Sequence, residues 1–266
     1  MNILETILDQ KRQEVASRKR TVPVTMLRES PNYSRTPLSL SKALAGKPMA
    51  IIAEIKKASP SKNVIRQNFD PAGIAREYVK GGAAGISVLT DEEFFQGSLD
   101  HLRLVRGLVA IPLLRKDFII DEYQLHESKA AGADAVLLIM AALGPDRLRA
   151  LRLTAVELGL EPVVEVHTAG DIEGLGDDPV TIIGINNRDL ATFRAELSTS
   201  LRLIPVIRRG TTVISESGIS SADDLRELMR NGIHAALVGE LLLRAPDPGH
   251  ALRELLGGVE ATPWSR

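Results

Sequence analysis

The chain has 266 residues, of which 44% are hydrophobic and 25% are charged, and its formal net charge at pH 7 is −1. It has no cysteine, which excludes disulfides, thiolate metal sites and cysteine nucleophiles, and only 3% of its residues are aromatic. Because the chain has no basic field and its apolar runs are too short to span a bilayer, we expect a cytoplasmic protein that binds neither nucleic acid nor a membrane.

The first 48 residues contain helical patterns but too little apolar sequence for a core of their own. Residues 2 to about 19 have the charged, amphipathic pattern of a helix and lack that of a signal peptide. A connection rich in Pro, Ser and Asn follows at residues 22–37, and a short helical pattern covers residues 39–45. We predict that residues 1–48 form a helical extension packed on the domain that follows.

Residues 49–258 alternate between short apolar runs and helical patterns. Gly82, Gly132 and Gly232 each separate a helical pattern from an apolar run, as a helix C-cap glycine does. Their separations of 50 and 100 residues equal two and four units of about 25 residues, each one strand plus one helix. The predicted strands are residues 50–55, 85–89, 111–115, 134–139, 162–166, 180–185, 211–215 and 234–238. The predicted helices are residues 71–80, 99–108, 122–131, 145–158, 168–175, 197–208, 221–230 and 248–256.

Eight strand and helix units of even length favour a parallel α/β sheet that closes into a (β/α)8 TIM barrel. The alternative is an open, doubly wound sheet, which the even spacing of eight units suits less well. Residues 259–266 are expected to form a loosely ordered C-terminal tail. The sequence thus predicts one catalytic barrel, residues 49–258, between the extension and the tail.

Polar side chains follow the predicted strands at the end where TIM barrels carry their active sites. Glu54 and Lys56 lie where the first strand stops, and because side chains alternate along a strand, they share one face and Ile55 takes the other. The ends of later strands carry Lys116, Glu165, Asn186, Glu216 and Ser217.

Single charges at strand ends can also have ordinary structural roles. Lys56 could be only a salt-bridge partner of Glu54, Asp117 could be a helix N-cap, and His167 is expected to be structural or solvent-exposed. Independent surface charges would not fall so regularly at one end of a barrel. The set as a whole therefore predicts an active site.

Glycine turns follow the last two predicted strands, in the stretches ESGISS and LVGELL. Gly218 and Gly239 let the backbone approach an anion, and N–H groups at helix N-termini bind it. Although each could be an ordinary turn, the loops after strands seven and eight are the usual phosphate position in TIM barrels. Together they predict a phosphate site.

The chain resembles the indole-3-glycerol phosphate synthase family over nearly its whole length. The matching stretches are IIAEIKKASPSK, LLRKDFIIDEYQ, EPVVEVH, IGINNRDL, ISESGI and the N-terminal ILDQKRQEV. The resemblance implies the family's reaction in tryptophan biosynthesis, in which 1-(2-carboxyphenylamino)-1-deoxy-D-ribulose 5-phosphate closes to indole-3-glycerol phosphate and loses carbon dioxide and water. It also implies that no cofactor and no metal are needed.

The resemblance further implies roles for the residues. Lys116 is the expected general acid for ring closure, Glu165 positions it, and Lys56 and Glu54 serve the dehydration. Asn186, Glu216 and Ser217 match catalytic positions that contact the substrate. The expected substrate-binding residues are Arg188 for the carboxylate, Phe118 for the aromatic ring, and Ser59, Ser61, Gly218 and Gly239 for the phosphate.

The sequence departs from some relatives at Ala58 and Glu240, where they have lysine and serine. We expect the Glu240 side chain to point away from the phosphate, because two negative charges repel. Two other functions compete with the main one. Phosphoribosylanthranilate isomerase is also a barrel but uses a cysteine, and a catalytically silent binding barrel should lack a lysine or glutamate of the set. We expect a monomer, with weak association with other enzymes of the pathway left open.

Overall fold

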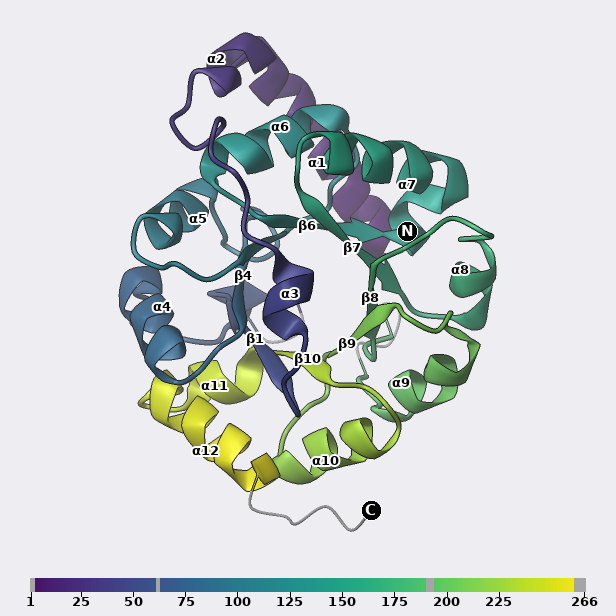
Figure 1. Cartoon of the computed structure of the whole chain (residues 1–266). Coiled ribbons are helices and arrows are strands. Elements are labelled where there is room, and N and C mark those ends of the chain that lie inside the picture. The colour runs from purple at the N-terminus through teal and green to yellow at the C-terminus, as the bar shows by residue number, and fades with distance from the viewer. Residues whose placement is uncertain (1–2, 61–62, 190–193, 261–266) are drawn as a thin grey trace.

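Eight of the described strands of the computed structural model close into a single barrel (Figure 1). The structure describes residues 3–60, 63–189 and 194–260. Each barrel strand pairs in parallel with the next along the chain, and the last pairs with the first, with Ala50 opposite Ala235. The barrel strands are β1 (Ala50–Ile55), β4 (Gly85–Leu89), β5 (Leu113–Lys116), β6 (Ala135–Ile139), β7 (Glu161–Val166), β8 (Ile182–Asn186), β9 (Thr212–Glu216) and β10 (Ala235–Val238). The predicted TIM barrel is confirmed, and the open sheet is wrong.

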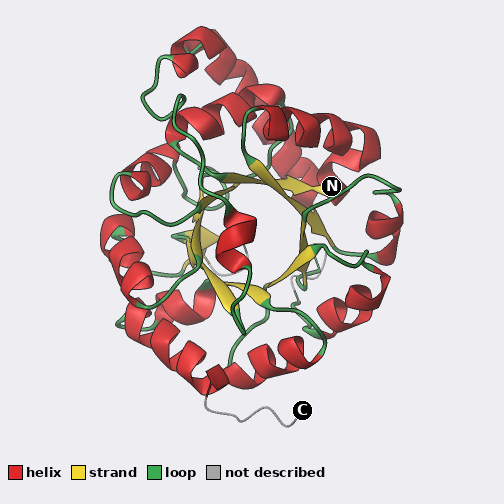
Figure 2. Ribbon diagram, in the orientation of Figure 1, coloured by secondary structure: helices red, strands yellow, loops and turns green. Residues whose placement is uncertain are grey.

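Helices surround the barrel as an outer ring (Figure 2). Those that follow the strands are α4 (Pro71–Lys80), α5 (Leu99–Arg106), α6 (Glu122–Ala131), α7 (Met140–Glu157), α8 (Ala169–Glu173), α9 (Ser198–Leu203), α10 (Ala222–Arg230), α11 (Glu240–Arg244) and α12 (Pro248–Glu260). Among the described residues, no helix has the length and apolar character needed to cross a membrane.

Local side-chain chemistry sets several helix ends. The Asp70 side chain accepts a hydrogen bond from Ala72 N, and Pro71 occupies the first turn of α4, as the sequence predicts. Gly132 ends α6 with φ +89°, a left-handed conformation that glycine adopts without steric cost. Most of the predicted helices are therefore found close to their expected bounds.

The departures from prediction have local causes. The helix predicted from residue 145 begins at Met140, and Gly144 interrupts it with φ +68° and ψ 170° just before Pro145. The helix predicted over residues 197–208 divides into α9 and a 3-10 turn, Ile204–Val206, that contains Pro205. Two short elements were not predicted, because they are too short to show a period: α2 (Val24–Arg28), and the hairpin of β2 (Ala58–Ser59) with β3 (Asn63–Val64). The short helix α11 follows Gly239, in the stretch LVGELL where the sequence predicts a glycine turn into a helix.

The extension closes the amino end of the barrel. Its helix α3 (Leu40–Leu44) lies over the barrel opening in Figure 2, and Leu40 and Leu44 join the core inside the barrel. The hydroxyls of Ser39 and Ser41 donate to Glu161 at the start of β7, at 2.8 and 2.9 Å. With this end filled, the carboxyl end of the barrel is left for a functional site.

The first helix, α1 (Ile3–Thr21), is attached by a lysine with no exposed surface. Lys11 Nζ lies 2.8 Å from Asp91, 2.9 Å from Asp117 and 2.9 Å from Glu14. Burial alone would lower the pKa of Lys11, but the carboxylates of Asp117, Asp91 and Glu14 outweigh burial and raise it. Asp117 is thus part of a buried ion network, and the alternative that it is a helix N-cap is wrong, since Asp121 caps α6.

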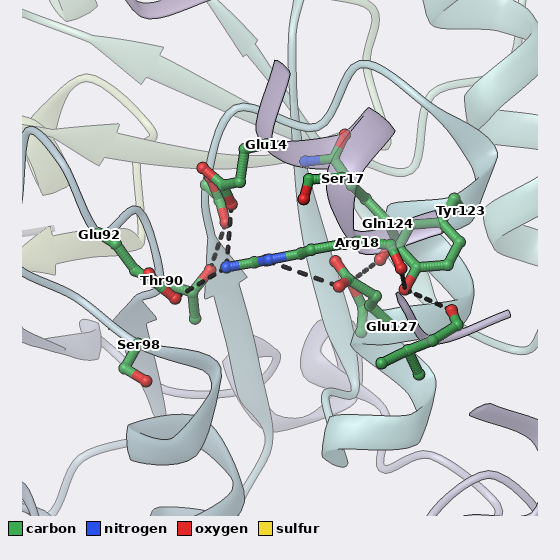
Figure 3. Close-up of polar contacts among 12 residues, drawn as sticks. Glu14, Ser17, Arg18, Thr90, Glu92, Ser98, Tyr123, Gln124 and Glu127 are labelled. Carbon is green, nitrogen blue, oxygen red and sulfur yellow. Dashed lines mark hydrogen bonds and ion pairs between the residues drawn. The ribbon is translucent and has the colours of Figure 1, made fainter. Parts of the chain in front are cut away.

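Arg18 adds further ion pairs between α1 and the barrel, as Figure 3 shows. Its guanidinium lies 3.0 Å from Glu14, 2.8 Å from Glu92 and 3.5 Å from Glu127. The Tyr123 hydroxyl of α6 donates to the carbonyl of Val22 at 2.8 Å. The predicted packing of the extension on the barrel therefore rests on charged contacts as well as apolar ones.

We predict that Lys11→Met lowers the free energy of unfolding by about 3 kcal/mol, because it leaves buried carboxylates without their cation. Urea unfolding followed by circular dichroism measures this change. The control is Arg12→Met on the same helix, whose ion pair with Asp9 is exposed and should contribute less than about 0.5 kcal/mol. Equal losses in the two variants would contradict the prediction.

Candidate active site

A cavity of about 600 Å³ lies at the carboxyl ends of the barrel strands. Its polar wall combines side chains from five strands: Glu54 of β1, Lys116 of β5, Glu165 of β7, Asn186 of β8 and Glu216 of β9. Strand alternation explains this, because each side chain lies near the end of its strand on the face that points into the barrel. The cavity is therefore built where the sequence predicts a site.

The cavity wall holds every predicted site residue that the structure describes. These are Glu54, Lys56, Ser59, Lys116, Phe118, Glu165, Asn186, Arg188, Glu216, Ser217, Gly218 and Gly239. Ser61 lies outside the described residues. The apolar part of the wall includes Phe95 and Phe118, with ring centroids 6.2 Å apart, and three side chains of α1 that sequence reasoning missed: Ile3, Leu4 and Ile7.

Lys116 is the charge at the centre of the site. Its Nζ donates to Glu216 Oε2 at 2.6 Å and to Glu165 Oε2 at 3.4 Å, and Asn186 donates to the other Glu165 oxygen at 3.2 Å. Burial opposes the charge of Lys116, but Glu216, Glu165 and Glu54 outweigh it and raise the pKa of Lys116. Lys116 is therefore protonated in the free site.

Glu216 is the carboxylate that titrates near neutrality. Burial, together with the negative charges of Glu165 and Glu54, raises the pKa of Glu216 to about 7, although Lys116 acts in the opposite direction. Its second oxygen, Oε1, has no hydrogen-bond partner among the described residues. The cluster therefore contains one group that can gain or lose a proton at physiological pH.

Glu54 and Lys56 form an ion pair at the mouth of β1. Burial would raise the pKa of Glu54, but Lys56, Lys116 and Arg188 together lower it. Glu54 is thus held as a carboxylate beside a cation. The shared face that the sequence predicts for this pair is what brings the two groups together.

Two glycines make room for the carboxylates. A Cβ at Gly184 of β8 would collide with Glu216 Oε1, and a Cβ at Gly239 would lie 2.9 Å from the Cβ of Glu54. Gly239 was predicted to bind phosphate, and this steric role is an additional one. The role of Gly184 was not predicted, since the sequence does not show which side chain a glycine inside a strand faces.

The end of the cavity where the sequence predicts a phosphate site includes left-handed backbone. Ser217 has φ +68° and Gly218 has φ +80°, and both line the cavity. Glu240 begins α11, and its carboxylate lies 2.9 Å from Arg244, which balances its charge beside the cavity. Among the described residues, no group of three or more His, Asp or Glu side chains could hold a metal ion.

His167 is a further side chain that touches the site. It follows β7 on the same face as Glu165, and its Nε2 lies 3.4 Å from Glu165 Oε1. The alternative of a solvent-exposed histidine is wrong, since the side chain is only 13% exposed. The two-residue spacing from Glu165 was the sequence signal that could have placed it there.

The fold and site define a TIM barrel with lysines paired with carboxylates in a cavity at the carboxyl ends of its strands. A sequence model of the indole-3-glycerol phosphate synthase family matches residues 4–255. The chain belongs to this family, which removes the alternative of the cysteine-dependent isomerase.

Curated relatives support the assignment at high similarity. The chain is 48% identical over 257 residues to "Indole-3-glycerol phosphate synthase" of Salinibacter ruber, covering 96% of this chain and 95% of the relative. It is 46% identical to the protein of the same name from Carboxydothermus hydrogenoformans, covering 95% and 99%. Among solved structures, a 3-hexulose-6-phosphate synthase from Salmonella typhimurium has a TM-score of 0.63 at 14% identity, covering 80% of this chain and 99% of that one, and shows the fold alone.

We predict that the Glu216 carboxyl titrates near pH 7, and that Lys116→Met raises this value, because it removes the cation that favours the charged form. Carbon-13 NMR of glutamate-labelled protein measures the titration. The spectrum of Glu216→Gln identifies the resonance by its loss. An unchanged or lower midpoint in Lys116→Met would contradict the assigned causes.

Proposed function

We propose that this chain converts 1-(2-carboxyphenylamino)-1-deoxy-D-ribulose 5-phosphate to indole-3-glycerol phosphate, carbon dioxide and water. The observation that carries the proposal is Lys116, a largely buried ammonium held by Glu216 and Glu165 on the wall of a cavity with an apolar side and a glycine-lined end. The family to which the chain belongs is named for the product of this reaction. An ammonium, carboxylates, an apolar side and a glycine-lined end within one cavity support the proposal.

Ring closure needs an acid at the ketone oxygen. As the aromatic carbon attacks the ketone, Lys116 donates its proton to the developing alkoxide. The carboxylates around Lys116 make it a weak acid, and the protonation state of Glu216 changes its acidity. Once Glu216 gains a proton, the nearest carboxylate is neutral and Lys116 releases its proton more readily.

The later steps use the remaining carboxylates and the second lysine. Glu165, held by Asn186, stabilises the positive charge that forms on the anilino nitrogen. Loss of carbon dioxide then returns an electron pair to the ring. Lys56 protonates the departing hydroxyl as water while Glu54 takes the proton from carbon, which completes the indole.

Substrate binding is divided between the two sides of the cavity. The guanidinium of Arg188 suits the anthranilate carboxylate, and Phe118 packs on the ring. Ser59, Gly218 and Gly239 hold the phosphate, with Ser61 expected to join them and Ser217 beside them. The proposed ligand is this phosphorylated small molecule. We propose that the enzyme is a cytoplasmic monomer, and weak association with other pathway enzymes is compatible with this proposal.

We predict that the purified protein generates indole fluorescence from the synthetic substrate and that Lys116→Ala lowers turnover by about 10²-fold, the scale of a positioned proton donor. The control is Lys80→Ala, which removes an exposed ion pair far from the cavity wall. A wild-type protein that binds the substrate without producing indole fluorescence would support the silent barrel instead. Near-normal turnover by Lys116→Ala would reject its role as the acid.

A late role for Glu54 makes a different prediction. Glu54→Gln should slow dehydration and let a closed, decarboxylated but still hydroxylated species accumulate, because the base is lost after the ring has formed. Lys116→Ala should instead leave the open-chain substrate. Rapid-quench sampling with mass spectrometry separates the two species by the mass of carbon dioxide. Finding only open-chain substrate with Glu54→Gln would place Glu54 at or before ring closure.

A further inference from the structure

Asn187 lies behind the active site and joins three elements. It follows Asn186 at the end of β8, and the residue is 3% exposed. Its Nδ2 donates to Ser215 Oγ of β9 and to the carbonyl of Ser217, both at 2.9 Å. Its Oδ1 accepts from the backbone N and the hydroxyl of Ser200 in α9, at 3.0 and 2.8 Å. All hydrogen-bonding positions of the amide are therefore occupied.

The orientation of this amide is fixed by its backbone partners. The Ser200 N–H can only donate and the Ser217 carbonyl can only accept, so Oδ1 must face Ser200 and Nδ2 must face Ser217. The hydroxyls of Ser200 and Ser215, 2.8 Å apart, then complete a ring in one direction. Asn187 donates to Ser215, which donates to Ser200, which donates back to Asn187. A closed buried ring of this kind holds its members in one arrangement.

The bond to Ser217 decides where the next amide points. In a trans peptide the carbonyl and the following N–H point in opposite directions. The Ser217 carbonyl points to Asn187, which is absent from the described residues of the cavity wall, whereas Ser217 and Gly218 are part of that wall. The Gly218 N–H therefore points toward the cavity. The left-handed φ of +68° at Ser217, uncommon for a residue other than glycine, is held by this contact.

We propose that Asn187 is a positioning residue for substrate binding, which holds the Ser217–Gly218 peptide with its N–H directed at the phosphate of the substrate. This inference rests on the proposed function, whose phosphate end it specifies. Turned N–H groups of this kind bind anions without any cationic side chain. The requirement for phosphate binding thus extends to a residue that does not touch the substrate.

Asn187→Asp is the sharpest variant, because it keeps the shape and replaces the Nδ2 donor by an oxygen that repels the Ser217 carbonyl. The matched control is Ser200→Ala, which opens the same ring but leaves the bond from Asn187 to Ser217. The probe is inorganic phosphate, whose dissociation constant follows from the rise in melting temperature with its concentration. We expect this constant and the KM of the substrate to increase about tenfold in Asn187→Asp, the equivalent of one hydrogen bond to a charged group. In Ser200→Ala they should change less than twofold, and kcat should stay within about threefold in both.

A measurement on the wild-type protein does not depend on how the variants fold. The amide resonance of Gly218 in nitrogen-15 NMR should shift when phosphate is added. A silent Gly218 amide, or equal weakening of phosphate binding by Asn187→Asp and Ser200→Ala, would overturn the proposal. Failure of this inference can be distinguished from failure of the proposed function. The first is read from the phosphate response of Gly218 and the second from indole fluorescence, and neither measurement depends on the other.

Discussion

The contact between Lys116 and Glu216 is the constraint around which the site is arranged. Two largely buried charges are stable only if each has a close partner, and here one lysine serves both Glu216 and Glu165. With Glu54 and Lys56 included, the group has three carboxylates and two lysines. Burial, with the excess negative charge added to it, raises the pKa of one carboxylate, Glu216, to about 7.

The excess negative charge also limits where the cavity can bind the anionic groups of a substrate. A substrate with a phosphate and a carboxylate is repelled by an acidic cluster, so its anionic groups need partners that offset the carboxylates of Glu216 and Glu165. In the proposed binding mode, the turned backbone at Ser217 and Gly218 and the guanidinium of Arg188, all on the cavity wall, are these partners. Backbone N–H groups suit the phosphate because they attract an anion without a full positive charge that would pair with the carboxylates.

The sequence predicts the parts of this arrangement that have a local cause. Apolar runs, glycine caps and the alternation of Glu54 with Ile55 determine the barrel and one face of each strand end, and the predicted side chains meet in one cavity. Other features depend on contacts between distant segments. Lys11, Asp91 and Asp117 look like ordinary solvated charges in the sequence, and only packing of α1 on the barrel buries them. Gly184 likewise shows its purpose only beside Glu216.

The end of β5 shows why the protein keeps two charged networks apart. Lys116 reaches Glu216 and Glu165 inside the barrel, whereas its neighbours Arg115 and Asp117 pair with each other at 2.9 Å, and Asp117 also binds Lys11 of the extension. Lys11 and Arg115 hold the pKa of Asp117 below its usual range against the effect of burial, so Asp117 keeps its charge at physiological pH. In the other network, the pKa of Glu216 is about 7. Strand alternation thus lets one short segment carry a fixed set of charges for folding and a titrating set for chemistry, because adjacent side chains face opposite sides of the sheet.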